Sequence, residues 1–251
     1  MPHLRDARGP EGVRLYAIGD VHGRLDLLRE MHDRIARDLI RRPCAAFRVI
    51  HLGDYIDRGP DSAGVIAHLI EFCRDGDAVC LMGNHDHFMR RFFENPVEVA
   101  SLWLNNGGEE AVASYGVDPL VLHSNNLLRK ALEAAVPAEH RAFLNAMPLS
   151  ERHGDYLFVH AGIRPGVPLK RQKAVDLFTI REPFLSSEAD HGVIVVHGHT
   201  VCTAPAIRRN RIGIDTKAYA TGRLSCLVLE DAEKGFLEPG GYFSLDLAAA
   251  A

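Results

Sequence analysis

The stretch GDYIDRGPDS, residues 53–62, is a turn rich in glycine and charge that directly follows a predicted buried strand. The run before it, Phe47–Leu52, is largely apolar and predicts a β-strand. After the strand, two carboxylates, Asp54 and Asp57, stand three residues apart beside Arg58. Such a polar turn can serve solubility alone. Its meaning therefore depends on what the ends of the other strands carry.

The segments around this stretch predict a βαβαβ unit. The strand Val13–Ile18 is followed by helical spacing over Arg24–Leu39, and Asp61 can cap a helix that reaches Cys73 before the strand Ala78–Met82. Such units form parallel sheets with right-handed crossovers. The later strands follow one another with little helix between them and predict a mixed or antiparallel half: Tyr156–Val159, Val193–Val196, Arg211–Ile214 and Leu224–Leu229. The fold class is α/β.

Composition limits the kind of protein. The chain has 251 residues, 47% hydrophobic and 25% charged, as in an ordinary globular protein. A net charge of −4 gives no basic surface for nucleic acid, and no apolar run is long enough to span a membrane. The five cysteines are odd in number and lack CxxC spacing, which favours a reducing compartment. We expect one cytoplasmic domain over residues 1–251.

Polar motifs follow the other strands as well. They read GDVHG (19–23), GNHD (83–86), HAG (160–162) and HGHT (197–200). Each motif alone can be a turn, but together they indicate a site, because ligands bind at the carboxyl ends of strands in open α/β sheets. Six side chains should meet there: Asp20, His22, Asp54, Asn84, His160 and His199. Mixed oxygen and imidazole ligands suit Mn²⁺, Fe or Zn²⁺ better than Ca²⁺. Six ligands fit two ions that share a bridging carboxylate.

These motifs resemble a known family. GDVHG, GDYIDRG, GNHD, HAG and GHT are similar to the signature blocks of the calcineurin-like metallophosphoesterases, in the phosphoprotein phosphatase branch and its bacterial and phage serine/threonine type, as in lambda phage phosphatase. The resemblance covers about Leu15 to Leu229. It implies a four-layer α/β/β/α sandwich with two mixed sheets and a dinuclear metal site at the strand carboxyl ends.

The resemblance also implies roles for individual residues. Asp20 and His22 would bind the first metal, Asp54 would bridge, and the second metal would take Asn84, His160 and His199. The family pattern favours the histidine of GHT, although His197 lies on the same strand face and stays open. His85 would be the general acid, held by Asp57. Two arginines would bind the phosphate: Arg58, and Arg181 of the TIRE segment, residues 179–182.

The implied reaction is phosphomonoester hydrolysis by a serine/threonine protein phosphatase. A hydroxide bridging two divalent ions, Mn²⁺ first, with Fe or Zn²⁺ as alternatives, would attack phosphorus in line. The substrate would be a phosphorylated protein or a small phosphoester. Symmetrical diadenosine tetraphosphate hydrolases share blocks like DRGPDS and GNHD but usually read GDIQG, where this chain has His22. Dinucleoside polyphosphate hydrolysis is therefore the alternative, and a non-catalytic metal or phosphate sensor is the third hypothesis.

Residues 95–150 form a predicted helical, cap-like insert. SLWLNNGGEEAVASYGV (101–117) contains the only tryptophan, and Leu127–Met147 has helical spacing. The insert can simply pack on the sheet, or it can select substrate above the metals. We expect no role for His51 and His68, whereas His87 stays open because it is close to the motif GNHD.

Overall fold

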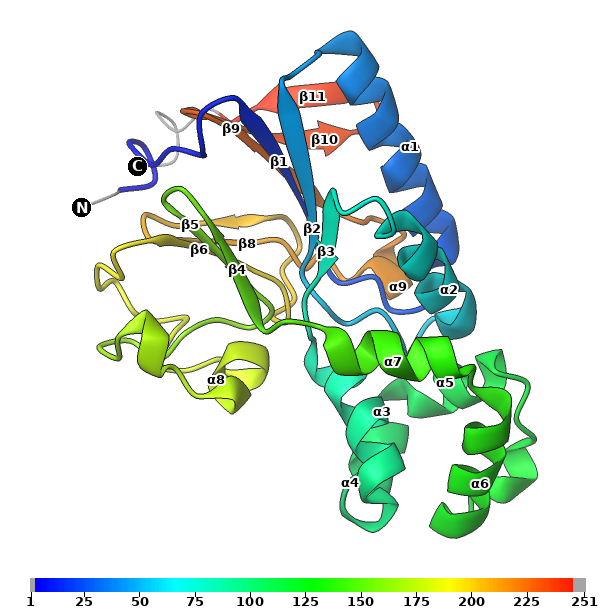
Figure 1. The fold of residues 1–251 in the computed structure, drawn as a ribbon. Helices are drawn as coiled ribbons and strands as arrows, with labels where there is room; N and C mark the ends of the chain where they lie inside the picture. The colour runs from blue at the N-terminus through cyan, green and yellow to red at the C-terminus, as the bar shows by residue number, and fades with distance from the viewer. Residues whose placement is uncertain (1–2, 246–251) are drawn as a thin grey trace.

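Two β-sheets face each other in the protein, whose computed structural model describes residues 3–245 (Figure 1). The first sheet has six strands in the order β11-β10-β9-β1-β2-β3. Their bounds are β1 Val13–Ile18, β2 Ala46–His51, β3 Ala78–Cys80, β9 Cys226–Glu230, β10 Glu233–Glu238 and β11 Gly241–Ser244. Strands β1, β2 and β3 run parallel, and β9, β10 and β11 add antiparallel pairs. This sheet is therefore mixed.

The second sheet has five strands in the order β4-β5-β6-β8-β7. Their bounds are β4 Ser150–His153, β5 Tyr156–Val159, β6 Ile194–His197, β7 Ala206–Ile207 and β8 Arg211–Gly213. Strands β5, β6 and β8 are parallel, whereas β4 and β7 are antiparallel edges. The predicted mixed character of the second half is confirmed.

The helices surround these sheets (Figure 1). They are α1 Leu25–Arg41, α2 Ser62–Phe72, α3 Asn84–Glu94, α4 Pro96–Trp103, α5 Glu109–Ser114, α6 Asn125–Ala135, α7 Ala138–Ala146, α8 Ala174–Thr179 and α9 Ala218–Thr221, with a π-helical turn at Leu104–Gly108. Helices α3 to α7 follow β3 and lie together beside the ends of its sheet (Figure 1). Among residues 3–245, no helix combines the length and apolar character needed to cross a membrane.

Alternating side chains divide the core into layers. In β1, Leu15 and Ala17 point inward and pack against Phe158 and Val196 of the second sheet. Tyr16 points outward, toward the helices. On the outer face of the second sheet, Leu157, Val159 and Val195 pack against Leu177 of α8. The layers therefore run helix, sheet, sheet, helix, as the resemblance implied.

The first half of the chain follows the sequence pattern closely. The carboxylate of Asp61 caps α2 by accepting the N–H of Gly64 at 2.8 Å, as expected. Strand β1 has the predicted bounds. The predicted helix over 127–147 is divided into α6 and α7 because Pro137 lies between them and cannot continue the hydrogen-bond ladder.

Candidate metal centre

The carboxyl ends of five strands meet in one place. Asp20 and His22 follow β1, Asp54 follows β2, Asn84 begins α3 after β3, His160 follows β5 and His199 follows β6. All six side chains are buried or nearly so. The first sheet supplies four of them and the second sheet supplies two. The six side chains therefore meet at an edge that both sheets form together.

Asp54 lies at the centre of this group. Its Oδ2 is 3.5 Å from His22 Nε2 and 3.9 Å from His85 Nε2, while its Oδ1 is 3.4 Å from His160 Nε2. Two sets of potential ligand atoms each lie within 4.8 Å of one another: His22, Asp54 and His85, and Asp54, His160 and His199. Asp54 belongs to both sets, which is the geometry that a bridging carboxylate requires.

The imidazoles are oriented by the backbone. His22 Nδ1 donates to the Ile56 carbonyl at 2.8 Å, and His160 Nδ1 donates to the Leu52 carbonyl at 2.8 Å. These bonds leave both Nε2 atoms facing the centre, as metal-binding histidines in proteins usually do. His199 Nε2 is buried and has no hydrogen-bond partner. This unpaired atom is explained if it binds a ligand.

The buried charge also fits divalent cations. Burial and the charge of Asp215 raise the pKa of Asp20 well above its usual range, and burial raises the pKa of Asp215 too. Burial lowers the pKa of both His22 and His199 to about 3, so these rings are neutral. Ionisation of Asp20 and Asp215 is therefore unfavourable unless a positive charge lies nearby. Oxygen and imidazole donors in this arrangement suit divalent metal ions.

His160 is the exception among the rings. Burial alone would lower its pKa, but the charges of Asp54 and Asp20 outweigh burial and raise the pKa to about 10. Its Nε2 also lies 3.1 Å from Asn84 Oδ1. The surroundings of His160, Asp54 and Asn84 therefore favour positive charge between them.

A buried pair stands beside this centre. His85 Nδ1 donates to Asp57 Oδ2 at 2.6 Å. Burial alone would lower the pKa of His85, but Asp54 and Asp57 raise it. The indole N–H of Trp103 donates to both Asp57 oxygens, at 3.0 and 3.1 Å. The ring of His85 is therefore fixed by a carboxylate that is itself held in place.

Arg58 connects the pair to the centre. Its Nη1 donates to His22 Nε2 at 2.9 Å, and its Nη2 donates to His85 Nε2 at 3.0 Å. The guanidinium lies 5.0 Å from the ring centroid of Tyr219 in α9. The side chain of Arg181 is exposed. Burial and the charge of His160 lower the pKa of His199 most, and the Arg181 cation lowers it further. Both predicted phosphate-binding arginines thus lie near the candidate ligands.

Five residues of this region have left-handed backbone conformations that side chains other than glycine seldom adopt. Their φ angles are 45° for His22, 55° for Asp54, 73° for Asp57, 66° for Arg58 and 60° for His199. Strained backbone concentrates at functional sites, where the surrounding structure enforces it. This observation supports a functional site independently of the motifs.

Two glycines allow the loops to approach one another. A Cβ on Gly59 would lie 2.0 Å from the His22 carbonyl oxygen, and a Cβ on Gly198 would lie 2.0 Å from Asp20 Oδ1. Any side chain at either position would push the loops apart.

The two histidines of HGHT have different surroundings. His197 Nδ1 donates to the Gly198 carbonyl at 3.0 Å, and its ring packs against Phe184 at 5.1 Å. His199 instead faces Asp54 and His160. The motif alone could not separate them, because they lie on the same strand face.

Three residues near the site were not identified from the sequence. Asp86 accepts the N–H groups of Asp54 at 2.8 Å and Tyr55 at 3.0 Å, so it holds the loop after β2. Trp103 and Tyr219 contact Asp57 and Arg58 as described. Asp86 stands in the motif GNHD and Trp103 is the only tryptophan, so both had a signal; Tyr219 had none.

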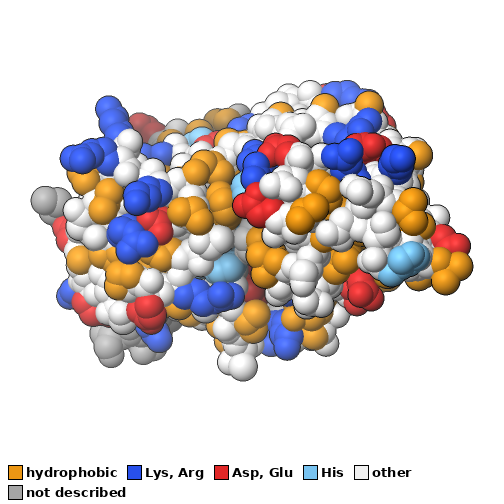
Figure 2. Space-filling model, turned by 90° about the horizontal axis from the view of Figure 1, so that it is seen from below, with side chains coloured by type: hydrophobic (Ala, Val, Ile, Leu, Met, Phe, Trp, Pro, Cys, Tyr) orange, Lys and Arg blue, Asp and Glu red, His pale blue; other side chains and the backbone are white. Residues whose placement is uncertain are grey.

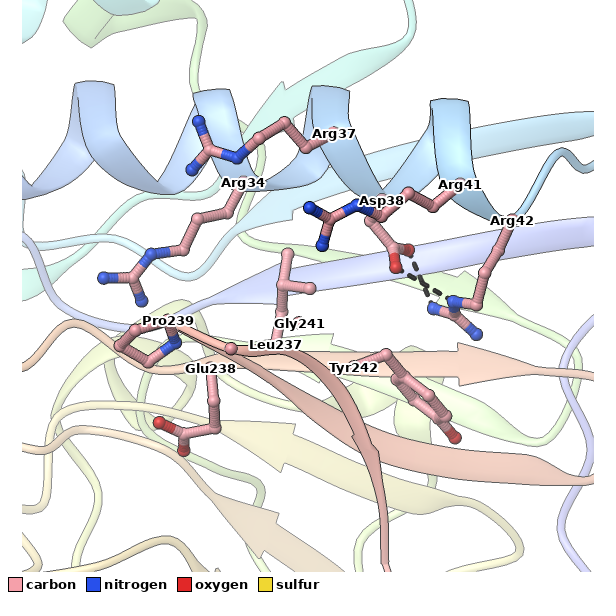
Figure 3. A pocket seen from close by; sticks show the side chains of 11 residues that line it. Arg34, Arg37, Asp38, Arg41, Arg42, Leu237, Glu238, Pro239, Gly241 and Tyr242 are labelled. Carbon is pink, nitrogen blue, oxygen red and sulfur yellow. Dashed lines mark hydrogen bonds and ion pairs between the residues drawn. The ribbon is translucent and has the colours of Figure 1, made fainter.

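A separate pocket lies at the far end of α1. Arg34, Arg37, Arg41 and Arg42 line it together with residues 237–242 (Figure 3). None of the candidate ligands lines this pocket, and α1 is 17 residues long, about 25 Å. It is not part of the candidate metal centre.

Comparison with family models gives the class of this protein. The family model of the calcineurin-like phosphoesterases matches residues 13–220, and the chain belongs to this family. It is therefore a hydrolase of the metallophosphoesterase class, with His/Asp groups suited to metal ions. The family predicted from the motifs is confirmed.

Curated relatives narrow the comparison. The chain is 30% identical over 156 residues to a symmetrical bis(5′-nucleosyl)-tetraphosphatase of Aromatoleum aromaticum, covering 61% of this chain but only 46% of that protein. It is 24% identical over 238 residues to the asymmetrical bis(5′-nucleosyl)-tetraphosphatase PrpE of Oceanobacillus iheyensis, covering 88% of this chain and 90% of the relative. The chain thus spans less than half of the first relative and nearly all of the second.

Solved structures share the fold. A protein described as a proposed diadenosine tetraphosphatase has a TM-score of 0.63 at 20% identity, covering 95% of this chain and 97% of the other. A cold-active protein tyrosine phosphatase has a TM-score of 0.64 at 16% identity, covering 97% and 82%. At these identities the likeness concerns the fold alone.

Proposed function

We propose that the protein hydrolyses dinucleoside polyphosphates, with diadenosine tetraphosphate as the substrate to test first. The observation that carries this choice is the similarity to the asymmetrical tetraphosphatase PrpE over 90% of its length. The symmetrical relative is similar over 46% of its length. Dinucleoside polyphosphate hydrolysis, the alternative to the predicted serine/threonine phosphatase, thus has the better support.

We also propose that two divalent cations occupy the candidate centre, Mn²⁺ before Fe or Zn²⁺. Asp20, His22, Asp54, Asn84, His160 and His199 would hold them, with Asp54 shared. Bound there, the cations would polarise the phosphoryl oxygens and lower the pKa of water. The unpaired His199 Nε2 and the two groups of potential ligand atoms that share Asp54 support this proposal.

The protein's own side chains would position and protonate the substrate. Arg58 can direct two N–H groups at phosphoryl oxygens, replacing its bonds to His22 and His85. His85 would then donate a proton from Nε2 to the departing oxygen, while Asp57 keeps the ring in orientation through Nδ1. Arg181 would add positive charge from the side of His199.

One observation favours a second candidate, a protein serine/threonine phosphatase. A serine alkoxide is too basic to leave without a proton, and His85 with Asp57 and Trp103 forms a complete proton-donating assembly. A nucleotide leaves readily without such help, because its terminal phosphate is far less basic. The assembly is therefore more than a tetraphosphatase strictly needs.

The deciding experiment compares substrates under one set of conditions. Protein loaded with Mn²⁺ should cleave diadenosine tetraphosphate with a higher kcat/KM than phosphoserine or phosphothreonine peptides. Chromatography of the products assigns the class, since ATP plus AMP indicates asymmetric cleavage and ADP alone indicates symmetric cleavage. Turnover of phosphopeptides without cleavage of the dinucleotide would overturn the proposal in favour of the protein phosphatase. Failure on p-nitrophenyl phosphate too would favour the non-catalytic sensor.

A further inference from the structure

A cavity of about 590 Å³ lies between the helical insert and α8. Its walls include His87, Phe88 and Arg90 of α3 and Val175 and Phe178 of α8. Its volume is in the range of pockets that bind small organic ligands. Figure 2 shows this side of the molecule from below, where a hollow separates two lobes and has hydrophobic and basic side chains along its edges.

The cavity adjoins the candidate metal centre on two sides. Phe88 lies three residues after His85, about 4.5 Å along the helix, and their ring centroids are 5.8 Å apart. On the opposite wall, Thr179 lines the cavity and its backbone interacts with the ring of His199. A ligand whose phosphate lies at the metals can therefore place its next group in the cavity.

The lining indicates the chemistry of that group. The rings of His87 and Phe178 pack against each other, with centroids 4.5 Å apart and planes inclined by 31°. Arg90 donates through Nη2 to His87 Nδ1 at 3.2 Å, but its buried Nε has no hydrogen-bond partner. Val175 is 52% exposed on the rim. Aromatic rings, apolar side chains and the guanidinium of a lining arginine match a planar heterocycle that carries hydrogen-bond acceptors.

We propose that this cavity binds one nucleoside of the substrate, with the base against its aromatic side chains and an acceptor atom toward the guanidinium of Arg90. The inference rests on the proposed function and extends it, because it assigns a specificity site outside the metal centre. Arg91, also in the lining, is already paired with Glu94 at 2.6 Å and Glu98 at 3.1 Å. Of the two lining arginines, Arg90 is therefore the one expected to contact the ligand.

Calorimetry on the Mn²⁺-loaded protein tests the cavity directly. Adenosine 5′-monophosphate and ribose 5-phosphate share the phosphate and the sugar and differ by the base. We expect the nucleotide to bind about tenfold more tightly or better, which corresponds to one stacked base. Equal dissociation constants would overturn the proposal.

Variants locate the effect. Arg90→Gln and Val175→Glu should each reduce the preference for the nucleotide to about threefold or less, since they remove the donor or place a negative charge at the rim. The matched controls lie outside the cavity: Arg129→Gln, which also removes a guanidinium, and Val97→Glu, at a side chain that is 77% exposed. Both controls should keep the preference. An unchanged preference in Arg90→Gln and Val175→Glu would place the base elsewhere.

The results separate this inference from the proposed function. Cleavage of diadenosine tetraphosphate without any preference for the base would leave the tetraphosphatase standing and eliminate the cavity. A preference for the base that depends on Arg90 and Val175, without cleavage of the dinucleotide, would leave the cavity as a nucleotide site of a different phosphoesterase. Raised KM for the dinucleotide in both cavity variants is the result expected if both hold.

Discussion

At the scale of single residues, Asp54 carries the most demanding prediction. Its two oxygens face separate groups of potential ligands, so Asp54→Asn should disturb both ions at once. We expect elemental analysis to show loss of metal, with turnover reduced by about a hundredfold or more. Asp190→Asn, in an exposed loop, is the control. Full metal content with normal turnover would show that Asp54 does not bridge.

His85 has two possible roles, and the leaving group distinguishes them. If His85 donates a proton, His85→Asn should impair phosphoserine peptide hydrolysis about a hundredfold more than hydrolysis of p-nitrophenyl phosphate, whose leaving group departs unprotonated. Metal content should not change. His87→Asn, the same substitution two residues later, should show no dependence on the leaving group.

The structure also places His85 in a potential ligand set with His22 and Asp54. Loss of metal from His85→Asn, with equal losses on both substrates, would therefore make His85 a ligand instead of the acid.

The motifs predicted the positions of the candidate ligands because a residue after a parallel strand is placed by the sheet itself. They could not identify Tyr219, because α9 reaches Arg58 only through the packing of the whole chain. The family pattern favoured His199, but strand periodicity alone left His197 open, because it does not give the direction of a side chain beyond the strand end. Local spacing thus specifies strand ends, whereas side-chain direction depends on tertiary contacts.

At the scale of elements, α4 and the π-helical turn Leu104–Gly108 connect the insert to the site. Trp103 binds Asp57, and the Gly107 carbonyl accepts the N–H of Arg58 at 3.0 Å. A Cβ on Gly107, whose φ is 100°, would lie 2.9 Å from that same nitrogen. The insert therefore supports the loop after β2. This contact was not predictable from helical periodicity, which gives the face of a helix but not its partner.

Trp103→Phe tests this support. The change keeps an aromatic ring but removes both hydrogen bonds to the buried Asp57, so we expect the free energy of unfolding to fall by about 1–3 kcal/mol. It should lower kcat about tenfold with little change in KM, because the orientation of His85 depends on Asp57. Leu102→Ala, on the exposed side of the same helix, should change neither quantity. A purely structural tryptophan would lower stability and leave kcat intact.

At the scale of the whole molecule, three neighbouring histidines connect α1, α2 and β2. His32 Nδ1 lies 2.9 Å from His68 Nε2, and His32 Nε2 lies 2.9 Å from His51 Nε2. Burial lowers the pKa of His32 to about 2 and that of His51 to about 4. We predicted no role for His51 and His68; the structure gives them a place in the packing of the first sheet.

These histidines make the free energy of unfolding depend on pH. The native rings stay neutral below pH 6.5, where the unfolded rings bind protons, so the free energy of unfolding should decrease as the pH falls from about 6.5 toward 4. At pH 5 His32 and His51 each contribute a loss of about 2 kcal/mol relative to pH 7.5.

His32→Gln should reduce the difference in unfolding free energy between pH 7.5 and pH 5 by about that amount. Denaturant titrations at the two pH values measure it. The exposed His123, replaced by Gln, is the control. An identical pH dependence in His32→Gln would mean that acid acts on other groups.

The hydrogen bonds of Trp103 have a practical consequence. The chain contains one tryptophan, and its indole N–H donates to the carboxylate of Asp57, which orients His85. Its ultraviolet emission therefore comes from a single fluorophore beside the reacting groups. Metal loading, phosphate release and rearrangement of the loop after β2 should each change the intensity or wavelength of that emission. The protein thus has an intrinsic optical reporter, suited to stopped-flow measurement of individual steps without any attached dye.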